Sequence, residues 1–156
     1  MTKSEKYVSI IPQIRSVISG ETDMIANMAN VAAILHEEFD FWWTGFYRVE
    51  QGTLVLGPFQ GPVACTRIAK GRGVCGTAWQ RQETVMVEDV EKFKGHIACS
   101  SESRSEIVVP MLKSGEVIGV LDIDSRELSC FDLTDQLYLE QIVESLCSAD
   151  MSENDI

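Results

Sequence analysis

The chain has 156 residues, 45% of them hydrophobic and 24% charged, which suits one globular domain with a sizeable core. Its net charge of -11 argues against nucleic acid and anionic membranes as partners, because both attract clusters of Lys and Arg. No apolar run approaches the roughly 20 residues that span a bilayer, and the apolar residues 7–11 are too few for a secretory signal. We therefore expect a cytosolic protein.

Two helices are expected at the start of the chain. The first covers about residues 4–19, with Pro12 as a kink or a late start. Gly20 can end it. A second helix begins at Thr22, because apolar residues then recur at helical spacing, namely Met24, Ile25, Met28, Ala32 and Leu35.

Strands are expected next. Residues 41–49 are aromatic and β-branched, and residues 53–59 return after a turn to complete a hairpin. The following segments are then expected in order: a short strand near residues 63–68, a short helix over 74–81, a brief strand over 83–87 and a long loop over 89–102.

A second hairpin and a last helix complete the expected fold. Residues 106–112 and 116–124 flank a loop that ends in Gly115, and a three-residue loop would place Glu106 opposite Asp122. The last helix covers about residues 133–147, with a buried face formed by Leu133, Leu137, Ile142 and Leu146. The pattern predicts an α+β fold in which helices flank a central antiparallel sheet. We expect one domain over residues 1–156, with residues 148–156 as a frayed tail.

A glycine-rich segment matches a nucleotide-binding pattern. Residues 71–76, Gly-Arg-Gly-Val-Cys-Gly, fit G-x-G-x-x-G, which is a weak signal by itself. A dinucleotide-binding unit would place this segment after an early strand and continue with parallel β-α repeats. Here the segment lies in mid-chain before an antiparallel hairpin. We therefore expect the glycines to form a tight entry into the short helix.

Five cysteines need an explanation in a chain expected in the cytosol. An odd number argues against a structural disulfide framework. Cys65, Cys75 and Cys99, with His96, could suggest zinc, but no C-x-x-C pair is present and we expect no metal. A thiol redox set is favoured, because these three cysteines fall in loop or strand-end segments. The other two, Cys130 and Cys147, are expected to be small buried side chains.

Acidic residues mark the end of an apolar strand. Asp122 and Asp124 share one face with Ile118 and Val120. One interpretation is a solvated strand end with Arg104 as a counterion. The other is a pocket that holds an ammonium group or donates a proton, since clustered carboxylates raise one another's pKa. The residues alone do not decide between them.

Aromatic residues alternate on the first expected strand. Trp43 and Tyr47 fall on one face, and Trp42 and Phe46 on the other. Core packing is the usual fate of such side chains. One of the two faces could instead line a small-molecule pocket.

Seven short segments carry a resemblance to a known family. They are residues 45–47, 54–61, 64–65, 71–77, 95–99, 105–107 and 118–125. With these segments the chain resembles the free methionine-(R)-sulfoxide reductases, which are GAF-domain proteins, over roughly positions 20 to 147. The cysteine-containing segments are specific to this enzyme family and are not expected in a ligand-sensing GAF domain.

The resemblance implies an enzyme and a role for each cysteine in these segments. Cys99 would be the catalytic thiolate that attacks the sulfoxide sulfur and becomes a sulfenic acid. Cys65 would condense with it to form a disulfide, with Cys75 as the alternative resolving thiol. Thioredoxin, or a similar dithiol, would then reduce that disulfide. The physiological setting would be oxidative stress.

The resemblance also implies a substrate pocket. Glu106 and Asp124 would bind the sulfoxide oxygen and help to protonate it, and Asp122 would bind the substrate ammonium. Trp43 would contact the methyl end, and Tyr47 would shape the same pocket. The family needs no metal or organic cofactor, and its members are often homodimers.

Two other functions use the same features. A non-enzymatic GAF domain would bind a small ligand and report through partners, and a redox sensor would use the cysteines without turnover. Release of methionine from free methionine sulfoxide, in the presence of a thiol reductant, separates the enzyme from both.

Overall fold

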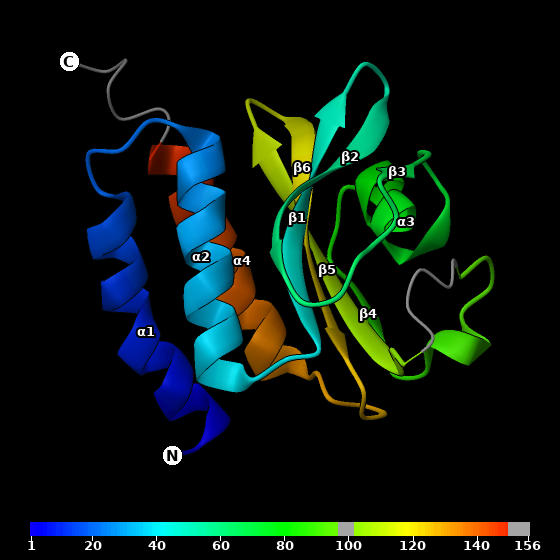
Figure 1. The fold of residues 1–156 in the computed structure, drawn as a ribbon, viewed down its shortest axis with the longest axis horizontal. Helices are drawn as coiled ribbons and strands as arrows, with labels where there is room; N and C mark the ends of the chain where they lie inside the picture. The colour runs from blue at the N-terminus through cyan, green and yellow to red at the C-terminus, as the bar shows by residue number, and fades with distance from the viewer. Residues whose placement is uncertain (97–101, 150–156) are drawn as a thin grey trace.

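The computed structural model describes residues 1–96 and 102–149 (Figure 1). Its helices are α1 (Lys3–Ile18), α2 (Met24–Phe39), α3 (Gly73–Arg81) and α4 (Leu133–Ala149), with a short 3-10 turn at Val90–Lys92. Its strands are β1 (Trp43–Glu50), β2 (Thr53–Gln60), β3 (Arg67–Ile68), β4 (Val85–Val87), β5 (Ser105–Lys113) and β6 (Glu116–Ser125). The order of elements agrees with the sequence expectation.

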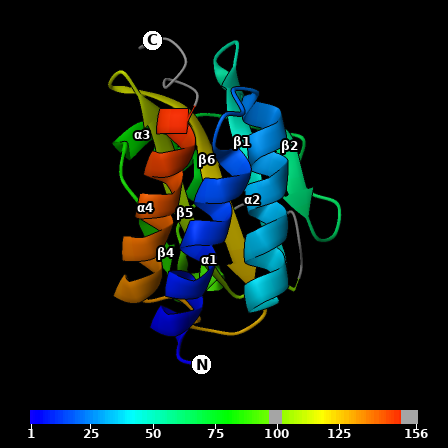
Figure 2. The same ribbon diagram turned by 90° about the vertical axis from the view of Figure 1, so that its left-hand side faces the viewer.

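A single antiparallel sheet forms the centre of the described residues, with strand order β3-β2-β1-β6-β5-β4. Helices α1, α2 and α4 lie on one side of it, and α3 lies on the other (Figures 1 and 2). The expected α+β architecture, with helices flanking an antiparallel sheet, is confirmed.

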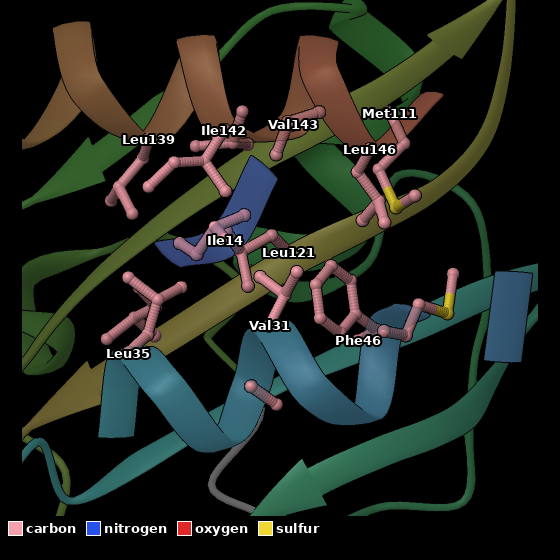
Figure 3. Close-up of a cluster of buried hydrophobic side chains, with 14 of the residues drawn as sticks. Ile14, Val31, Leu35, Phe46, Met111, Leu121, Leu139, Ile142, Val143 and Leu146 are labelled. Atoms are coloured by element: carbon pink, nitrogen blue, oxygen red, sulfur yellow. The ribbon is translucent and has the colours of Figure 1, made fainter. Parts of the chain in front are cut away.

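The larger core lies between the sheet and the three helices on that side. Phe46 and Leu121 come from adjacent central strands and meet Val31 of α2 and Leu146 of α4 (Figure 3). A second apolar cluster lies on the opposite face, where Trp43 and Val120 contact α3 residues such as Val74. Successive side chains along each strand point to opposite faces of the sheet. One face therefore packs against the helical core, and the other face carries the second cluster.

Helix α1 is continuous through Pro12, so Pro12 does not mark a late start. Thr2 forms a capping box, in which its side chain accepts from the amide of Glu5 and Glu5 bonds back to Thr2. The buried face of the helix, which includes Ile10 and Ile14, packs into the larger core. The cap and this packed face hold the helix although a proline lies within it.

The buried face predicted for α4 is partly wrong. Leu133 and Leu137 are 78% and 54% exposed, whereas Ile142 and Leu146 are buried as expected. At about 100° per residue, Leu133 and Leu137 project from the side of the helix opposite to Ile142 and Leu146. The buried face is completed instead by Asp135, Leu139, Val143 and Cys147.

The predicted register of the second hairpin is also wrong. Lys113 pairs with Glu116, so Ser114 and Gly115 form a two-residue turn, and Glu106 lies opposite Asp124 rather than Asp122. An irregularity between Met111 and Leu112 shifts the pairing further along the strands. Because the total shift is two residues, Glu106 stays on the same sheet face as both aspartates.

Two side chains change face relative to the prediction. Ile118 packs against the helical core and Val117 against the pocket-side cluster, because the irregularity in the hairpin interrupts the alternation there. Trp42 precedes β1 and packs on the pocket-side cluster, so it does not share a face with Phe46. Strand alternation cannot place a residue that lies outside the strand.

No helix among residues 1–96 and 102–149 has the length and apolar character needed to cross a membrane.

Candidate active site

A small pocket lies on the α3 side of the sheet. Its walls come from β1, from the amino end of α3, from β5 and β6, and from the loop after β2. Its volume is about 50 Å³, and roughly 10–15 Å³ measured in this way holds one water molecule. The pocket therefore has room for a compact ligand. The polar side chains that line it are Tyr47, Cys75, His96, Ser103, Glu106, Asp122 and Asp124.

Trp43 and Tyr47 form the aromatic wall of the pocket. The alternation on β1 predicts that they share a face, and the family resemblance implies that this face lines the pocket. Their ring centroids lie 6.0 Å apart, and Trp43 also stacks on Phe59 of β2 at 5.2 Å. Each ring anchors the loop after β2. The Trp43 indole donates to the carbonyl of Pro62 at 3.0 Å, and the Tyr47 hydroxyl donates to the carbonyl of Cys65 at 2.9 Å. These two hydrogen bonds hold the loop after β2, which contains Cys65, against the pocket.

Close backbone approach allows this packing. Gly45 pairs with both Phe59 and Asp122, and a Cβ built there would lie 2.3 Å from the Cβ of Phe59 and 2.7 Å from the Trp43 ring. Any larger residue at position 45 would displace the aromatic wall. Glycine here is required by the space around it.

The three carboxylates meet on the pocket face of β5 and β6. Glu106 and Asp124 are directly opposite each other in the sheet, and Asp122 lies one pleat further along β6. Glu106 and Asp122 are each 6% exposed, and Asp124 is half-buried and accepts from Ser103 Oγ at 3.2 Å. This burial favours the pocket interpretation over a solvated strand end.

Burial and mutual repulsion set the protonation of the three groups. Burial raises the pKa of Glu106 well above its ordinary value, and the charges of Asp122 and Asp124 raise it further. Burial and the charge of Asp122 likewise place the pKa of Asp124 well above its ordinary value. Burial also raises the pKa of Asp122, but hydrogen bonds with Glu106, Cys75 and Asp124 act to lower it. Asp122 is therefore the best placed of the three to carry the negative charge.

One atom of this cluster has an unmet hydrogen-bonding capacity. Asp122 Oδ1 is buried and has no hydrogen-bond partner within residues 1–96 and 102–149. An unsatisfied buried acceptor is costly, and such atoms are uncommon in native proteins. The arrangement suits a ligand that brings a donor to this oxygen, such as an ammonium group.

The cysteines differ in their surroundings. Cys65 is disulfide-bonded, whereas Cys75, Cys130 and Cys147 are not part of a disulfide. Cys75 lies in the pocket, where burial and the neighbouring carboxylates raise the pKa of its thiol well above the ordinary value. Cys147 is buried in the helical core, as expected, whereas Cys130 is only half-buried and packs against that core. Cys99 lies outside the described residues.

The pocket also contains a potential set of cation ligands. One ligand atom each from Cys75, Glu106 and Asp122 lies within 4.8 Å of the other two, and all three residues are buried. A thiolate with two carboxylates could hold a metal ion. The same atoms could equally surround an organic ammonium group.

Ser103 and His96 line the pocket although the sequence does not predict it. Ser103 lies at the end of the loop that precedes β5 and bonds to Asp124. His96 faces Asp122 across the pocket, and burial lowers the pKa of its imidazole. A serine two residues before the start of a strand carries no distinctive pattern. His96 lies close to Cys99 in the sequence, but that spacing suggests only a possible zinc ligand and does not predict a place in the pocket.

Comparison with known proteins agrees with the fold and the pocket. The GAF domain family matches residues 20–149. GAF domain-containing protein A of Dictyostelium discoideum is 59% identical over 146 residues, which is 93% of this chain and 92% of the relative. The free methionine-R-sulfoxide reductase of Escherichia coli is 48% identical over 147 residues, which is 94% of this chain and 89% of that enzyme.

A solved structure is also similar along nearly the whole chain. The free methionine-R-sulfoxide reductase of Neisseria meningitidis, in complex with its substrate, superposes with a TM-score of 0.96 at 52% identity, covering 99% of this chain and 94% of that one. Sequence and structure therefore agree that this chain belongs to the GAF domain family and, within it, to the group of the free methionine-R-sulfoxide reductases.

Proposed function

We propose that this protein reduces free methionine-R-sulfoxide to methionine by thiol chemistry in the pocket between β1, β5, β6 and α3. The observation that carries the proposal is the buried cluster of Glu106, Asp122 and Asp124 beside the wall of Trp43 and Tyr47. A sulfoxide is a polar oxygen on an otherwise apolar thioether, and this pocket offers acids on one side and aromatic rings on the other.

The three carboxyl groups have different roles because they differ in protonation. Glu106 and Asp124 have the most strongly raised pKa values, so they are suited to remain protonated and to donate to the sulfoxide oxygen. The oxygen of a sulfoxide leaves sulfur more readily when it is protonated. Asp122 keeps the charge and binds the α-ammonium through its unpartnered oxygen. Trp43 contacts the methyl end of the substrate, and Tyr47 shapes the wall beside it.

The chemistry begins with Cys99. Its thiolate attacks the sulfoxide sulfur, the oxygen passes to the cysteine with a proton, and methionine and a sulfenic acid are the products. The thiol of Cys65 then attacks the sulfenic acid, so that a disulfide forms and water leaves. A dithiol reductant exchanges with this disulfide and restores both thiols. Two electrons pass from the thiols of the protein to the sulfoxide, and the dithiol returns two electrons to the disulfide. No other oxidant or reductant is needed.

Cys65 is favoured over Cys75 as the resolving thiol. The Tyr47 hydroxyl positions the backbone of Cys65 at the pocket edge, and Cys65 is disulfide-bonded. Cys75 is a free thiol, and its raised pKa disfavours the thiolate that exchange requires. Cys75 remains the alternative resolving thiol. Thioredoxin as the reductant, a homodimer and a cytosolic location remain predictions from the resemblance.

The proposal is tested by substrate selectivity. Purified protein is assayed for methionine release, with a dithiol reductant, from the separated R and S epimers of free methionine sulfoxide. We expect turnover of the R epimer alone. Comparable rates on both epimers would contradict the stereochemical assignment, and no methionine from either would favour a sensor.

A further inference from the structure

We propose that the pocket also binds a zinc ion, through Cys75 of α3, Glu106 of β5 and Asp122 of β6, and that this ion competes with the substrate. The metal site itself does not depend on the proposed function. The competition rests on the proposed function, which assigns the substrate ammonium to Asp122. The proposal gives a role to Cys75, a buried pocket thiol that the favoured reaction sequence does not use.

Three donor atoms of suitable chemistry converge in the pocket. One ligand atom each from Cys75, Glu106 and Asp122 lies within 4.8 Å of the other two. Zinc binds thiolate sulfur at about 2.3 Å and carboxylate oxygen at about 2.0–2.2 Å, usually in a tetrahedron, so donor atoms around one ion lie about 3.5 Å apart. Small rotations of these side chains therefore bring the three donors onto one ion.

The fold holds the three residues in place. Cys75 lies in the first turn of α3, and Glu106 and Asp122 lie on the adjacent strands β5 and β6. Cys75 is 4% exposed, and the two acids are each 6% exposed. A Cβ on Gly76 would lie 2.5 Å from the carbonyl oxygen of Ala69, so the start of α3 packs tightly against the turn before it. A rigid set of donors loses little freedom when it binds an ion.

Asp122 supplies a second observation that points to a ligand. Its Oδ1 is buried and has no hydrogen-bond partner within residues 1–96 and 102–149. A buried acceptor without a partner is costly, and a cation among the three donors would satisfy it. Three protein ligands leave the fourth position of the tetrahedron for a water molecule, as in catalytic zinc sites.

The charge of the cluster also suits a dication. Burial raises the pKa of the Cys75 thiol and of Glu106 well above their ordinary values, so both hold a proton at neutral pH beside the charged Asp122. A zinc ion that binds all three groups releases these two protons. Two positive charges then replace two, and the cluster gains no further buried charge, which would be costly.

The donor set favours zinc over magnesium and calcium. Those two ions prefer six or more oxygen ligands, whereas this set has three protein donors and one of them is sulfur. Thiolate sulfur is a common zinc ligand. The sequence does not show the site, because its ligands come from three separate elements and form no C-x-x-C pair.

Zinc and the substrate need the same groups. Asp122 would bind the ion in place of the substrate ammonium, and Glu106 would lose the proton that it donates to the sulfoxide oxygen. Zinc is therefore expected to inhibit the reductase reversibly, by keeping the substrate out of the pocket.

Cobalt(II) is the probe for the metal site, because it occupies tetrahedral zinc sites and gives a thiolate-to-metal charge-transfer band that zinc lacks. Cobalt alone is titrated into the full chain carrying Cys65→Ser and Cys99→Ser, which removes two other thiols that could bind the metal. We expect a band that saturates at about one ion per chain and disappears when an equivalent of zinc is added. Absence of the band overturns the site.

Further substitutions in the same background identify the ligands. Cys75→Ser should abolish the band, whereas Cys147→Ser, which removes a buried thiol of the helical core, should keep it. Asp122→Asn should weaken cobalt binding about tenfold or more, which equals about 1.4 kcal/mol. Glu116→Gln, at the exposed start of β6, should leave the affinity unchanged. Circular dichroism checks that each variant is folded, and a band that survives Cys75→Ser overturns the site.

Methionine, the product of the proposed reaction, tests the competition. Its ammonium would take Asp122, so methionine should remove the cobalt band at a concentration at which alanine does not. Both amino acids chelate cobalt in solution through the same amine and carboxylate, so alanine controls for that loss of metal. Equal removal by the two amino acids, or by neither, overturns the competition.

The outcomes separate this inference from the proposed function. Without a cobalt band the metal site is wrong, and the reductase proposal stands on its own assay of methionine release. Absence of methionine release from free R-sulfoxide, beside a cobalt band that depends on Cys75, would contradict the proposed function and leave the metal site in place.

Discussion

At the scale of single residues, burial gives three similar carboxylates different properties. Glu106 and Asp124 lie opposite each other, and burial with mutual charge keeps their pKa values well above ordinary. Asp122 receives hydrogen bonds that oppose the effect of burial on its pKa. The same side-chain chemistry can thus serve both a proton donor and an anionic binding group.

The roles of Cys65 and Cys75 can be separated by substitution. In a single turnover without reductant, both Cys65→Ser and Cys75→Ser should release about one equivalent of methionine, because the first step needs only Cys99. With thioredoxin present, Cys65→Ser should recycle poorly, and Cys75→Ser should recycle well. The measurement is methionine released per protein in each regime. Poor recycling of Cys75→Ser beside normal recycling of Cys65→Ser would reverse the assignment.

The protonation of Glu106 also predicts a dependence of stability on pH. Because its folded-state pKa is raised above the ordinary 4.5, the folded protein holds a proton that the unfolded chain releases. This contribution to stability is fully present below the unfolded-state pKa and is lost as pH rises towards the folded-state value. Glu106→Gln removes the titrating group, so it should gain stability relative to wild type as pH rises above about 4.5.

Urea unfolding at a series of pH values measures the difference in free energy of unfolding between Glu106→Gln and wild type. Glu116→Gln, at the exposed start of β6, is the matched control and should show little change across the same range. A difference between Glu106→Gln and wild type that stays constant with pH would mean that Glu106 does not titrate as proposed. Activity of Glu106→Gln should fall at every pH, since an amide is a much weaker acid.

At the scale of elements, the sequence predicts the face of each site residue better than its partner. Trp43 shares a face of β1 with Tyr47, and Asp122 shares a face of β6 with Asp124, as predicted, because alternation along a strand depends only on local sequence. The pairing of Glu106 depends on the turn and on an irregularity near Met111, and neither has a distinctive residue pattern. The prediction for α4 fails for a similar reason, because an apolar residue such as Leu133 can lie outside the buried face.

The turn between β5 and β6 carries a correctable strain. Ser114 has a φ of +54° and Gly115 one of +80°, as in a two-residue turn that favours Asn-Gly. Ser114→Asn should therefore stabilise the protein by about 0.5 kcal/mol or more, since asparagine tolerates this conformation better. Ser114→Val should destabilise it, because a β-branched residue is poorly suited to positive φ. Urea midpoints of both variants test this, and a more stable Val variant would contradict it.

At the scale of the whole molecule, one face of the sheet contributes mainly to stability and the other carries the candidate active site. One face supports the helical core, and the other face forms the pocket with α3. Helix α1 lies outside the residues matched by the GAF family and joins the core through a buried polar contact. There, the Tyr7 hydroxyl donates to Asp135 at 2.6 Å, and Lys3 bonds to the same carboxylate at 2.7 Å. Sequence periodicity predicts α1 and α4, but it cannot pair Tyr7 of α1 with Asp135 of α4, which lies 128 positions further along the chain.

Loss of this contact should destabilise the protein without altering the pocket. Tyr7→Phe removes one donor from the buried Asp135 and should cost about 1–3 kcal/mol. Ser4→Ala is the control, because the Ser4 contact with Tyr138 is exposed and should be nearly neutral. Denaturant unfolding measures both. KM for the substrate should not change in either variant, and an equal loss of stability in the two would contradict the role of Asp135.

The central claim is that the protein is a reductase whose chemistry depends on the thiol of Cys99. The most direct test is methionine release from free methionine-R-sulfoxide by Cys99→Ser, with Cys130→Ser assayed beside it under the same reductant. We predict no release in a single turnover for Cys99→Ser, since a serine hydroxyl cannot attack the sulfoxide sulfur as a thiolate does, and nearly wild-type release for Cys130→Ser. Wild-type release by Cys99→Ser would contradict the account.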